Sequence, residues 1–302
     1  MDLAALGDCL ATPACVITQG AAGLIAGFLL FLVAAGLTLI FGVLGFVNFI
    51  HGSFYMFGAY FAYTAYVLTG SYMLAILAGT AGAALIGAAV EFFIARKIYE
   101  ADVLLQILVC YALILIFDDV ARMIWGDEFL SMGMPEAFQR TPFFVLGGVI
   151  PPFYLLLIGA ALAIATGLAL LMQRTRYGKL VRAIAQNPRM VGALGINTRL
   201  VYLSVFMLGV ALAGAAGALA APVRSMTVGM GFSILIESFI VTVIGGMGSI
   251  AGALIAALSI GLVRSFGSVG FPLFTEGLIF LMMIGVLLVR PQGLLGRPVR
   301  EL

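Results

Sequence analysis

Long apolar runs separated by short polar segments dominate this chain. A run needs about 20 apolar residues to cross a membrane as a helix, and the sequence predicts about eight such spans. It therefore predicts an all-α polytopic integral membrane protein, organised as one transmembrane domain over residues 1–302. The expected spans are 20–44, 53–70, 72–95, 103–124, 151–172, 201–221, 232–263 and 272–289.

The run 232–263 is too long for a single crossing. Gly245, Gly246 and Gly248 interrupt it, and glycine weakens a helix interior. We expect either two short crossings or a re-entrant pair here, so one or two of the membrane segments should be broken.

Composition supports a membrane protein. Of the 302 residues, 64% are hydrophobic and only 9% are charged, whereas soluble domains carry about 25% charged residues. The short loops leave no room for a separate soluble domain. The few basic residues cannot form the stripe that nucleic-acid binding requires, so no nucleic-acid partner is expected.

The distribution of Lys and Arg predicts orientation, because cytoplasmic loops carry the excess of these residues. Segment 173–200 holds six basic residues and no acid, which places it in the cytoplasm. Counting spans from there puts the N-terminal segment 1–19 and the acidic loop 126–150 outside. The tail 290–302, with Arg290, Arg297 and Arg300, is predicted to lie in the cytoplasm if 232–263 crosses the membrane twice.

Cys9 and Cys15 lie in the segment predicted to be outside, where a disulfide between them could form. Spacing alone does not set disulfide geometry, and two unpaired thiols are the expectation that we prefer from sequence.

A polar, glycine-rich break separates the first two spans, in the stretch GVLGFVNFIHGSFYMFGAY (42–60). Asn48, the single histidine His51, Gly52 and Ser53 lie within it. Polar groups at membrane depth need partners, so this stretch is either a broken helix lining a path, as in many transporters, or a cytoplasmic turn with Asn48 or Ser53 as N-cap. The residues alone do not decide between the two.

A second break lies in VTVIGGMGSIAGALIAALSIGL (241–262), where Gly245 and Gly246 can unwind the helix. Unwound backbone at membrane depth is tolerated where it lines a cavity. Two such breaks, one in each half of the chain, match the pattern of a pore, although glycine-rich spans also arise from packing.

Segment 173–200 predicts two short helices that meet at Asn187-Pro188, with Gly195 ending the second at positive φ. A compact basic knob of this kind can dock on a cytoplasmic protein. From composition alone, contact with anionic lipid headgroups is the simpler interpretation.

Ionisable residues within spans are candidates for function. Asp118 can pair with Arg122 at i, i+4, Glu91 should be paired or reach the interface, and Glu237 and Glu276 should lie near the outer rim. No ladder of acids crosses the membrane centre, which argues against a proton-coupled carrier.

The residues needed for several kinds of binding and catalysis are absent from the sequence. The chain has no phosphate-binding G-x-x-x-x-G-K-[ST] loop, and one histidine with three scattered cysteines forms no metal site. No nucleophile, base and acid set is visible. The sequence thus predicts neither an enzyme nor a cofactor or metal protein.

The stretch GLTLIFGVLGFVNFIHGSFYMFGAY (36–60) closely resembles the signature of the inner-membrane permeases of branched-chain amino acid ABC transporters, specifically the first of their two homologous permease subunits. RYGKLVRAIAQNPRMVGALGIN (176–197), VTVIGGMGSIAGALIAALSIGL (241–262) and RPQGLLGR (290–297) resemble the same family in order and spacing.

This resemblance implies a transport subunit that works with a second permease subunit, two cytoplasmic ATP-binding subunits and a periplasmic substrate-binding protein, in a bacterial inner membrane. It also implies roles for two sets of residues. One is docking of segment 173–200 on an ATP-binding subunit, which replaces the interpretation that this segment contacts lipid headgroups. The path would be bordered by Asn48, His51, Gly52, Ser53, Gly245, Gly246, Gly248 and Ser249. The segment that couples to the ATPase would include Arg182, Ala185, Asn187, Ala193, Leu194, Gly195, Ile196 and Asn197.

The chain departs from the family at Ser53, where an acid is usual, at Val109 to Ala112 and at Asp118-Asp119. Family members also import amides, urea and aromatic acids, so the solute stays open. The alternative function is an ion- or proton-coupled carrier of small polar solutes, which would need titratable groups at the membrane centre.

Overall fold

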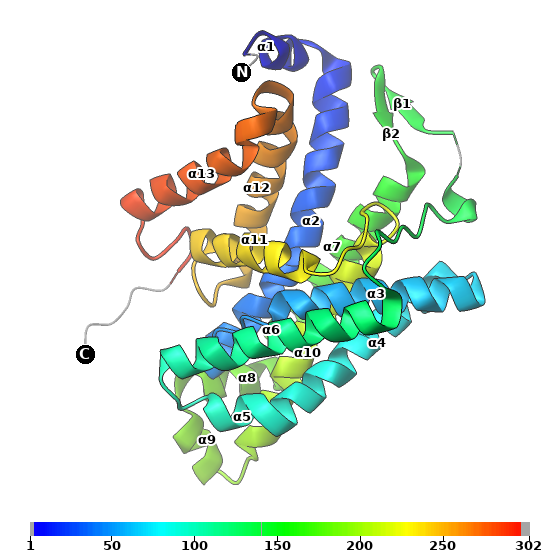
Figure 1. Cartoon of the computed structure of the whole chain (residues 1–302). Helices are drawn as coiled ribbons and strands as arrows, with labels where there is room; N and C mark the ends of the chain where they lie inside the picture. The colour runs from blue at the N-terminus through cyan, green and yellow to red at the C-terminus, as the bar shows by residue number, and fades with distance from the viewer. Residues whose placement is uncertain (1–2, 140, 297–302) are drawn as a thin grey trace.

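The computed structural model describes residues 3–139 and 141–296 and is almost entirely helical (Figure 1). Some charged residues of the segments that predict the orientation lie outside the described residues, among them Asp2, Arg140, Arg297 and Arg300. The helices are α1 (Leu3–Ala11), α2 (Pro13–Leu44), α3 (His51–Thr69), α4 (Tyr72–Val90), α5 (Arg96–Ile98), α6 (Val103–Trp125), α7 (Pro152–Arg174), α8 (Arg176–Gln186), α9 (Pro188–Ala193), α10 (Thr198–Ala220), α11 (Met230–Gly245), α12 (Ile250–Gly270) and α13 (Thr275–Val289).

Short irregular elements join these helices. A π-helical turn, Glu91–Ala95, links α4 to α5, and 3-10 turns cover Glu136–Phe138 and Pro272–Phe274. A small antiparallel hairpin, β1 (Phe143–Val145) with β2 (Gly148–Ile150), pairs Phe143 with Ile150. The hairpin and α1 lie at one end of the molecule, and α8 and α9 lie at the other.

Seven helices of the described chain are long and apolar enough to cross a membrane. The predicted all-α polytopic fold is therefore confirmed. The predicted span 53–70 is the helix α3, whose 19 residues include four tyrosines and which is less apolar than the others. The seven are Pro13–Leu44, Tyr72–Ile98, Val103–Trp125, Pro152–Arg174, Thr198–Ala220, Ile250–Gly270 and Pro272–Val289.

The core lies where α2, α3, α4 and α10 meet. Every residue of α2 from Phe28 to Ile40 is buried, as is every residue of α10 from Leu212 to Ala220. Small residues allow this close packing. A Cβ at Gly58 of α3 would collide with the Gly214 carbonyl of α10. By contrast, α6 and α13 are largely peripheral, with exposed apolar residues such as Met123 and Leu288.

The long seventh run is broken at the predicted glycines. Helix α11 ends at Gly245. In the turn that follows, Gly246 has a φ of 98° and Gly248 a φ of 85°. The Ser249 hydroxyl then caps α12 by accepting a hydrogen bond from the Gly252 N–H (3.1 Å). Helices α11 and α12 pack against each other. The break is thus confirmed, while the number of crossings stays a prediction.

The expectation of two unpaired thiols in the N-terminal segment is wrong. Cys9 and Cys15 form a disulfide. Helix α1 ends at Ala11 and α2 begins at Pro13, and this tight turn brings the two Cα atoms to 5.2 Å, within the range of ordinary disulfides. The turn lies between two helices within a segment where no helix was predicted, so the spacing of the two cysteines allowed this disulfide but could not decide for it.

Candidate functional site

The first break lies in residues 45–50, between α2 and α3. Gly45 ends α2 at a φ of 65°, and its N–H donates to the Phe41 carbonyl. His51 then begins α3, so neither Asn48 nor Ser53 is the side-chain N-cap that one interpretation required.

Asn48 and His51 are completely buried. His51 Nε2 donates a hydrogen bond to the Val33 carbonyl of α2 (3.0 Å). Both polar atoms of the Asn48 amide and His51 Nδ1 have no partner among the described residues. Unpaired buried polar atoms are unfavourable, and this break holds three of them without a partner among the described residues.

The two following residues, Gly52 and Ser53, are also buried. A Cβ at Gly52 would collide with the Gly231 carbonyl at the start of α11. The first break therefore lies at a tight crossing of α2, α3 and α11, and not on an open channel in this conformation.

The second break comes close to the first through α2. Thr38 of α2 and Thr242 of α11 share a hydroxyl–hydroxyl hydrogen bond of 3.2 Å. A Cβ on Gly42, near the end of α2, would lie 3.1 Å from the Cα of Gly248. The structure thus brings the two predicted breaks to the same part of the bundle.

The described part of the motif RPQGLLGR closes the second break. The Leu294 N–H donates to the Ile244 carbonyl (2.8 Å), and the Leu295 N–H donates to the Gly245 carbonyl (3.1 Å). These bonds satisfy the carbonyls that the end of α11 leaves free. The resemblance grouped this motif with the glycine cluster without indicating that they touch.

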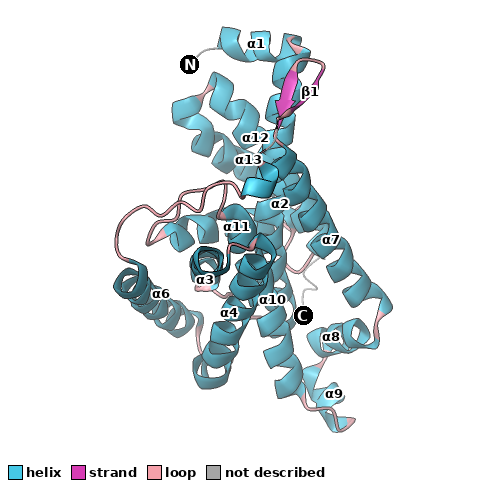
Figure 2. Ribbon diagram, turned by 90° about the vertical axis from the view of Figure 1, so that its right-hand side faces the viewer, coloured by secondary structure: helices cyan, strands magenta, loops and turns pink. Residues whose placement is uncertain are grey.

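Helices α8 and α9 form the predicted pair of short helices. Asn187 caps α9 through its side chain, which accepts from the Met190 N–H (3.0 Å), and Gly195 has a φ of 83°. Asn197 caps α10 by accepting from the Arg199 N–H (3.1 Å). The local structure predicted for 173–200 is confirmed, and Figure 2 shows the pair projecting at the end of the bundle opposite β1.

This pair rests on the bundle by one face only. Gly178, Val181 and Ile184 of α8 are buried, and the Arg182 guanidinium donates to the Met172 carbonyl. The Tyr177 hydroxyl lies 2.9 Å from the Ser204 Oγ of α10. Burial raises the pKa of Tyr177 above its ordinary value.

The opposite face of the pair is exposed. Met190 and Leu194 are 66% and 74% exposed, and Ala185, Ala193, Gly195, Ile196 and Asn197 are exposed as well. Exposed apolar side chains beside basic ones are typical of a contact surface. Arg182 is exposed too, but its guanidinium also contacts the end of α7.

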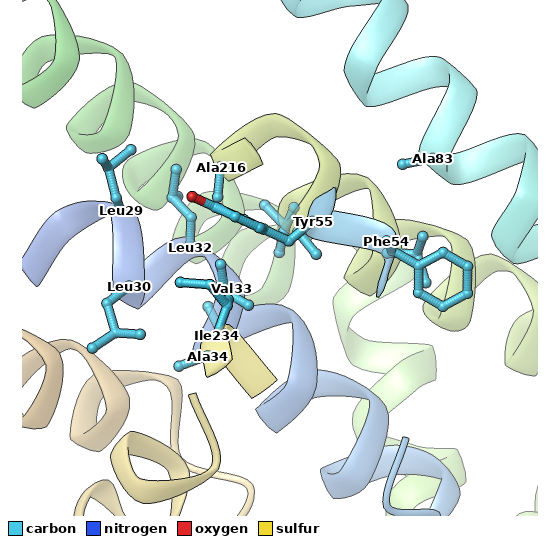
Figure 3. Packing of buried hydrophobic residues seen from close by; sticks show 14 of the residues in the cluster. Leu29, Leu30, Leu32, Val33, Ala34, Phe54, Tyr55, Ala83, Ala216 and Ile234 are labelled. Carbon is cyan, nitrogen blue, oxygen red and sulfur yellow. The ribbon is translucent and has the colours of Figure 1, made fainter. Parts of the chain in front are cut away.

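A cavity that the sequence did not predict lies between α3, α10, α11 and the loop that joins α10 to α11. Its volume is about 170 Å³. Tyr55, Arg224 and Glu237 line both this cavity and a narrower recess beside it. In Figure 3, the Tyr55 hydroxyl points away from α3 toward Leu29 of α2, with Ile234 of α11 nearby. None of the predicted path residues lines this cavity.

Glu237 belongs to an ionic cluster. Arg264 of α12 donates from Nη1 to Glu237 Oε2 (2.6 Å) and from Nη2 to Glu276 Oε1 (2.9 Å). Sequence analysis placed the two acids near a rim but did not identify Arg264 or Arg224. The signal that could have found them was charge of both signs in otherwise apolar segments of the C-terminal half.

The other predicted ion pairs need one correction. Arg122 binds Asp119 (2.9 Å) and Asp127 (3.3 Å) instead of Asp118. Helical spacing allows i, i+3 as well as i, i+4 contacts, and the turn after α6 adds Asp127. Glu91 is buried and pairs with Arg96 (3.1 Å), as expected.

These features define a multi-pass helical membrane protein with two broken segments and an exposed helix pair at one end. A family model described as branched-chain amino acid transport system / permease component matches residues 20–287. The chain belongs to this permease family.

Curated relatives cover nearly the whole chain. The high-affinity branched-chain amino acid transport system permease protein BraD of Pseudomonas aeruginosa is 30% identical over 91% of this chain and 94% of its own length. The high-affinity branched-chain amino acid transport system permease protein LivH of Escherichia coli is 30% identical over 88% of this chain and 91% of its own length. A probable LivH of Methanocaldococcus jannaschii is 30% identical over 89% of each chain. No solved structure matches the chain.

Proposed function

We propose that this chain is the membrane-spanning subunit of an ABC importer for branched-chain amino acids or a related small solute. The observation that carries the proposal is the permease-family match over residues 20–287. The names of the relatives, which specify branched-chain amino acid transport, favour that solute class.

The proposed transporter contains a second homologous permease subunit, two cytoplasmic ATP-binding subunits and a periplasmic substrate-binding protein. The exposed apolar surfaces of α6 and α13 would contact membrane lipid or the second permease. The two buried breaks, at Asn48 to Ser53 and Gly245 to Ser249, would border the path in a conformation that opens between them.

We further propose that the protein lies in a bacterial inner membrane with its N-terminus outside and its C-terminus in the cytoplasm. The Cys9–Cys15 disulfide supports this orientation, because disulfides persist in oxidising compartments. The basic segment 173–200 supports a cytoplasmic location for α8 and α9.

In this proposal, α8 and α9 dock on an ATP-binding subunit. ATP-driven closure of the ATPase pair would push this helix pair and bias the bundle between outward-facing and inward-facing states. The exposed face of α9 and Leu194 supports the docking role, since it has no partner within the described chain.

Leu194→Asp tests the docking role. Leu194 is 74% exposed, so the change should leave folding intact while placing a charge in an apolar contact. We expect ATP-driven uptake to fall by roughly tenfold or more, as for a central interface residue. Uptake by vesicles, membrane levels of the tagged chain and co-purification of the ATP-binding subunits should be measured together.

Leu194→Met is the matched control and should retain uptake, because it keeps an apolar side chain at the same site. Gly195→Asp and deletion of 185–190 should also abolish uptake at normal membrane levels. Full uptake by Leu194→Asp or by the deletion variant would rule out the docking role.

A further inference from the structure

The cavity between α3, α10 and α11 lies near the C-terminal end of α10, away from α9. Helix α10 begins beside α9 and runs for 23 residues, roughly 34 Å of helix, before the chain reaches Arg224. The loop that follows α10 pairs with the 126–150 segment through a bridge between Leu130 and Met226. The cavity therefore lies toward the side that the charge distribution places outside.

Its size suits a small solute. A volume of about 170 Å³ corresponds to roughly five or six water molecules at the density of the liquid. Small residues of α3 and α10, namely Ala59, Gly217 and Ala220, line it and leave room for an aliphatic group. The narrower recess, lined by Leu30, Val33 and Ile234, extends this apolar wall.

Its polar wall carries both charges. Arg224 supplies a guanidinium, whose planar donors match a carboxylate. Glu237 supplies a carboxylate, and Arg264 holds its Oε2 atom, which leaves Oε1 without a hydrogen-bonding partner among the described residues. Tyr55 lies close enough to interact with both Arg224 and Glu237.

The charges of the cluster balance. Arg224 and Arg264 face Glu237 and Glu276, so a ligand that carries one positive and one negative group would add no net charge. A lone anion or cation would disturb this balance. Sugars and amides need no such pair of opposite charges.

We propose that Arg224 and Glu237 bind the carboxylate and the ammonium group of a zwitterionic aliphatic α-amino acid, with the Tyr55 hydroxyl between them. The aliphatic side chain would lie on the wall formed by Ala59, Gly217 and Ala220. Arg264 is a positioning residue that orients Glu237. This inference rests on the proposed function, because it places the solute of the importer at a defined site.

The test measures binding of radiolabelled leucine to the whole purified transporter without its soluble binding protein. Competition with leucinamide, which lacks the carboxylate, and with 4-methyl-2-oxopentanoate, which lacks the ammonium group, separates the two contacts. Wild type should bind leucine more tightly than either analogue by roughly tenfold or more, the size of a charge-assisted contact.

Two variants should change this preference in opposite ways. Arg224→Gln should weaken the binding of leucine and leave the affinity for leucinamide nearly unchanged, so that the preference for leucine over leucinamide is lost. Glu237→Gln should remove the preference over 4-methyl-2-oxopentanoate. Arg122→Gln is the matched control: Arg122 lies outside the cavity lining, is bound to Asp119 and Asp127, and its loss should leave all three affinities unchanged.

Three outcomes would overturn the site. The first is no saturable leucine binding to wild type, and the second is equal affinity for leucine and either analogue. The third is an equal loss of affinity for all three ligands in both variants. ATP-driven leucine uptake by wild type with its binding protein should be measured in parallel. If that uptake is absent, the assignment of branched-chain amino acids to the proposed importer fails. If uptake is present and an overturning outcome is found, only the site fails.

Discussion

At the scale of single residues, Asn48 and His51 are buried polar side chains with atoms that have no partner among the described residues. Such groups are costly to bury, and in transporters broken helices with polar groups border the substrate path. The unpaired atoms of Asn48 and His51 are consistent with their proposed role beside the path. A transporter that alternates between outward-facing and inward-facing states needs residues whose contacts differ between the two states. Gly52, next to them, must be glycine for a different reason, because any Cβ there would collide with the Gly231 carbonyl of α11.

Gly52→Val should therefore destabilise the protein. The added side chain would meet the Gly231 carbonyl, and overpacking typically costs about 1–3 kcal/mol. We expect a lower thermal unfolding midpoint of the solubilised transporter and reduced uptake. Gly285→Val is the control, because a Cβ at Gly285 meets no atom within 4 Å. Equal unfolding midpoints for the two variants would contradict this packing.

Sequence reasoning predicted single residues well where the property is local. The positive φ of Gly195 and the turn between two short helices at Asn187-Pro188 follow from neighbours in the chain. The side-chain caps at Asn187 and Ser249 were not predicted. The cavity could not be predicted in this way. Tyr55 and Glu237 are far apart in sequence and meet only through the packing of α3 and α11.

At the scale of elements, apolar runs located almost every helix, because length and hydropathy determine membrane spans directly. They predicted no helix in residues 1–19 and a first span of 20–44, whereas α1 covers Leu3–Ala11 and α2 already begins at Pro13. The predicted pairing of Asp118 with Arg122 was wrong, because i, i+3 and i, i+4 neighbours lie on one helical face and Arg122 binds Asp119 instead.

The Cys9–Cys15 disulfide allows a direct test of orientation. In a Cys110→Ala background, intact cells treated with a membrane-impermeant maleimide should show no labelling of this chain. After treatment with a membrane-impermeant phosphine reductant, both cysteines should be labelled, because the N-terminal segment is proposed to lie outside. Labelling only after permeabilisation would place this segment inside and contradict the orientation.

At the scale of the whole molecule, the described residues form a helical bundle with a charged cavity toward one end and an exposed helix pair at the other. Helix α10 spans the distance between them. In the proposed mechanism, movement of α8 and α9 at one end changes the packing of α10 against α2 and α3, and thereby the cavity at the other end. The energy for this change comes from the ATP-binding subunits.

The central claim is tested most directly by reconstituting the transporter into vesicles with and without its ATP-binding subunits. The complete assembly, supplied with binding protein, leucine and ATP, should accumulate leucine against its gradient, and ionophores should not prevent this. The permease subunits alone should accumulate none. Accumulation by this chain without any ATP-hydrolysing partner, driven by an ion gradient and abolished by ionophores, would contradict the account.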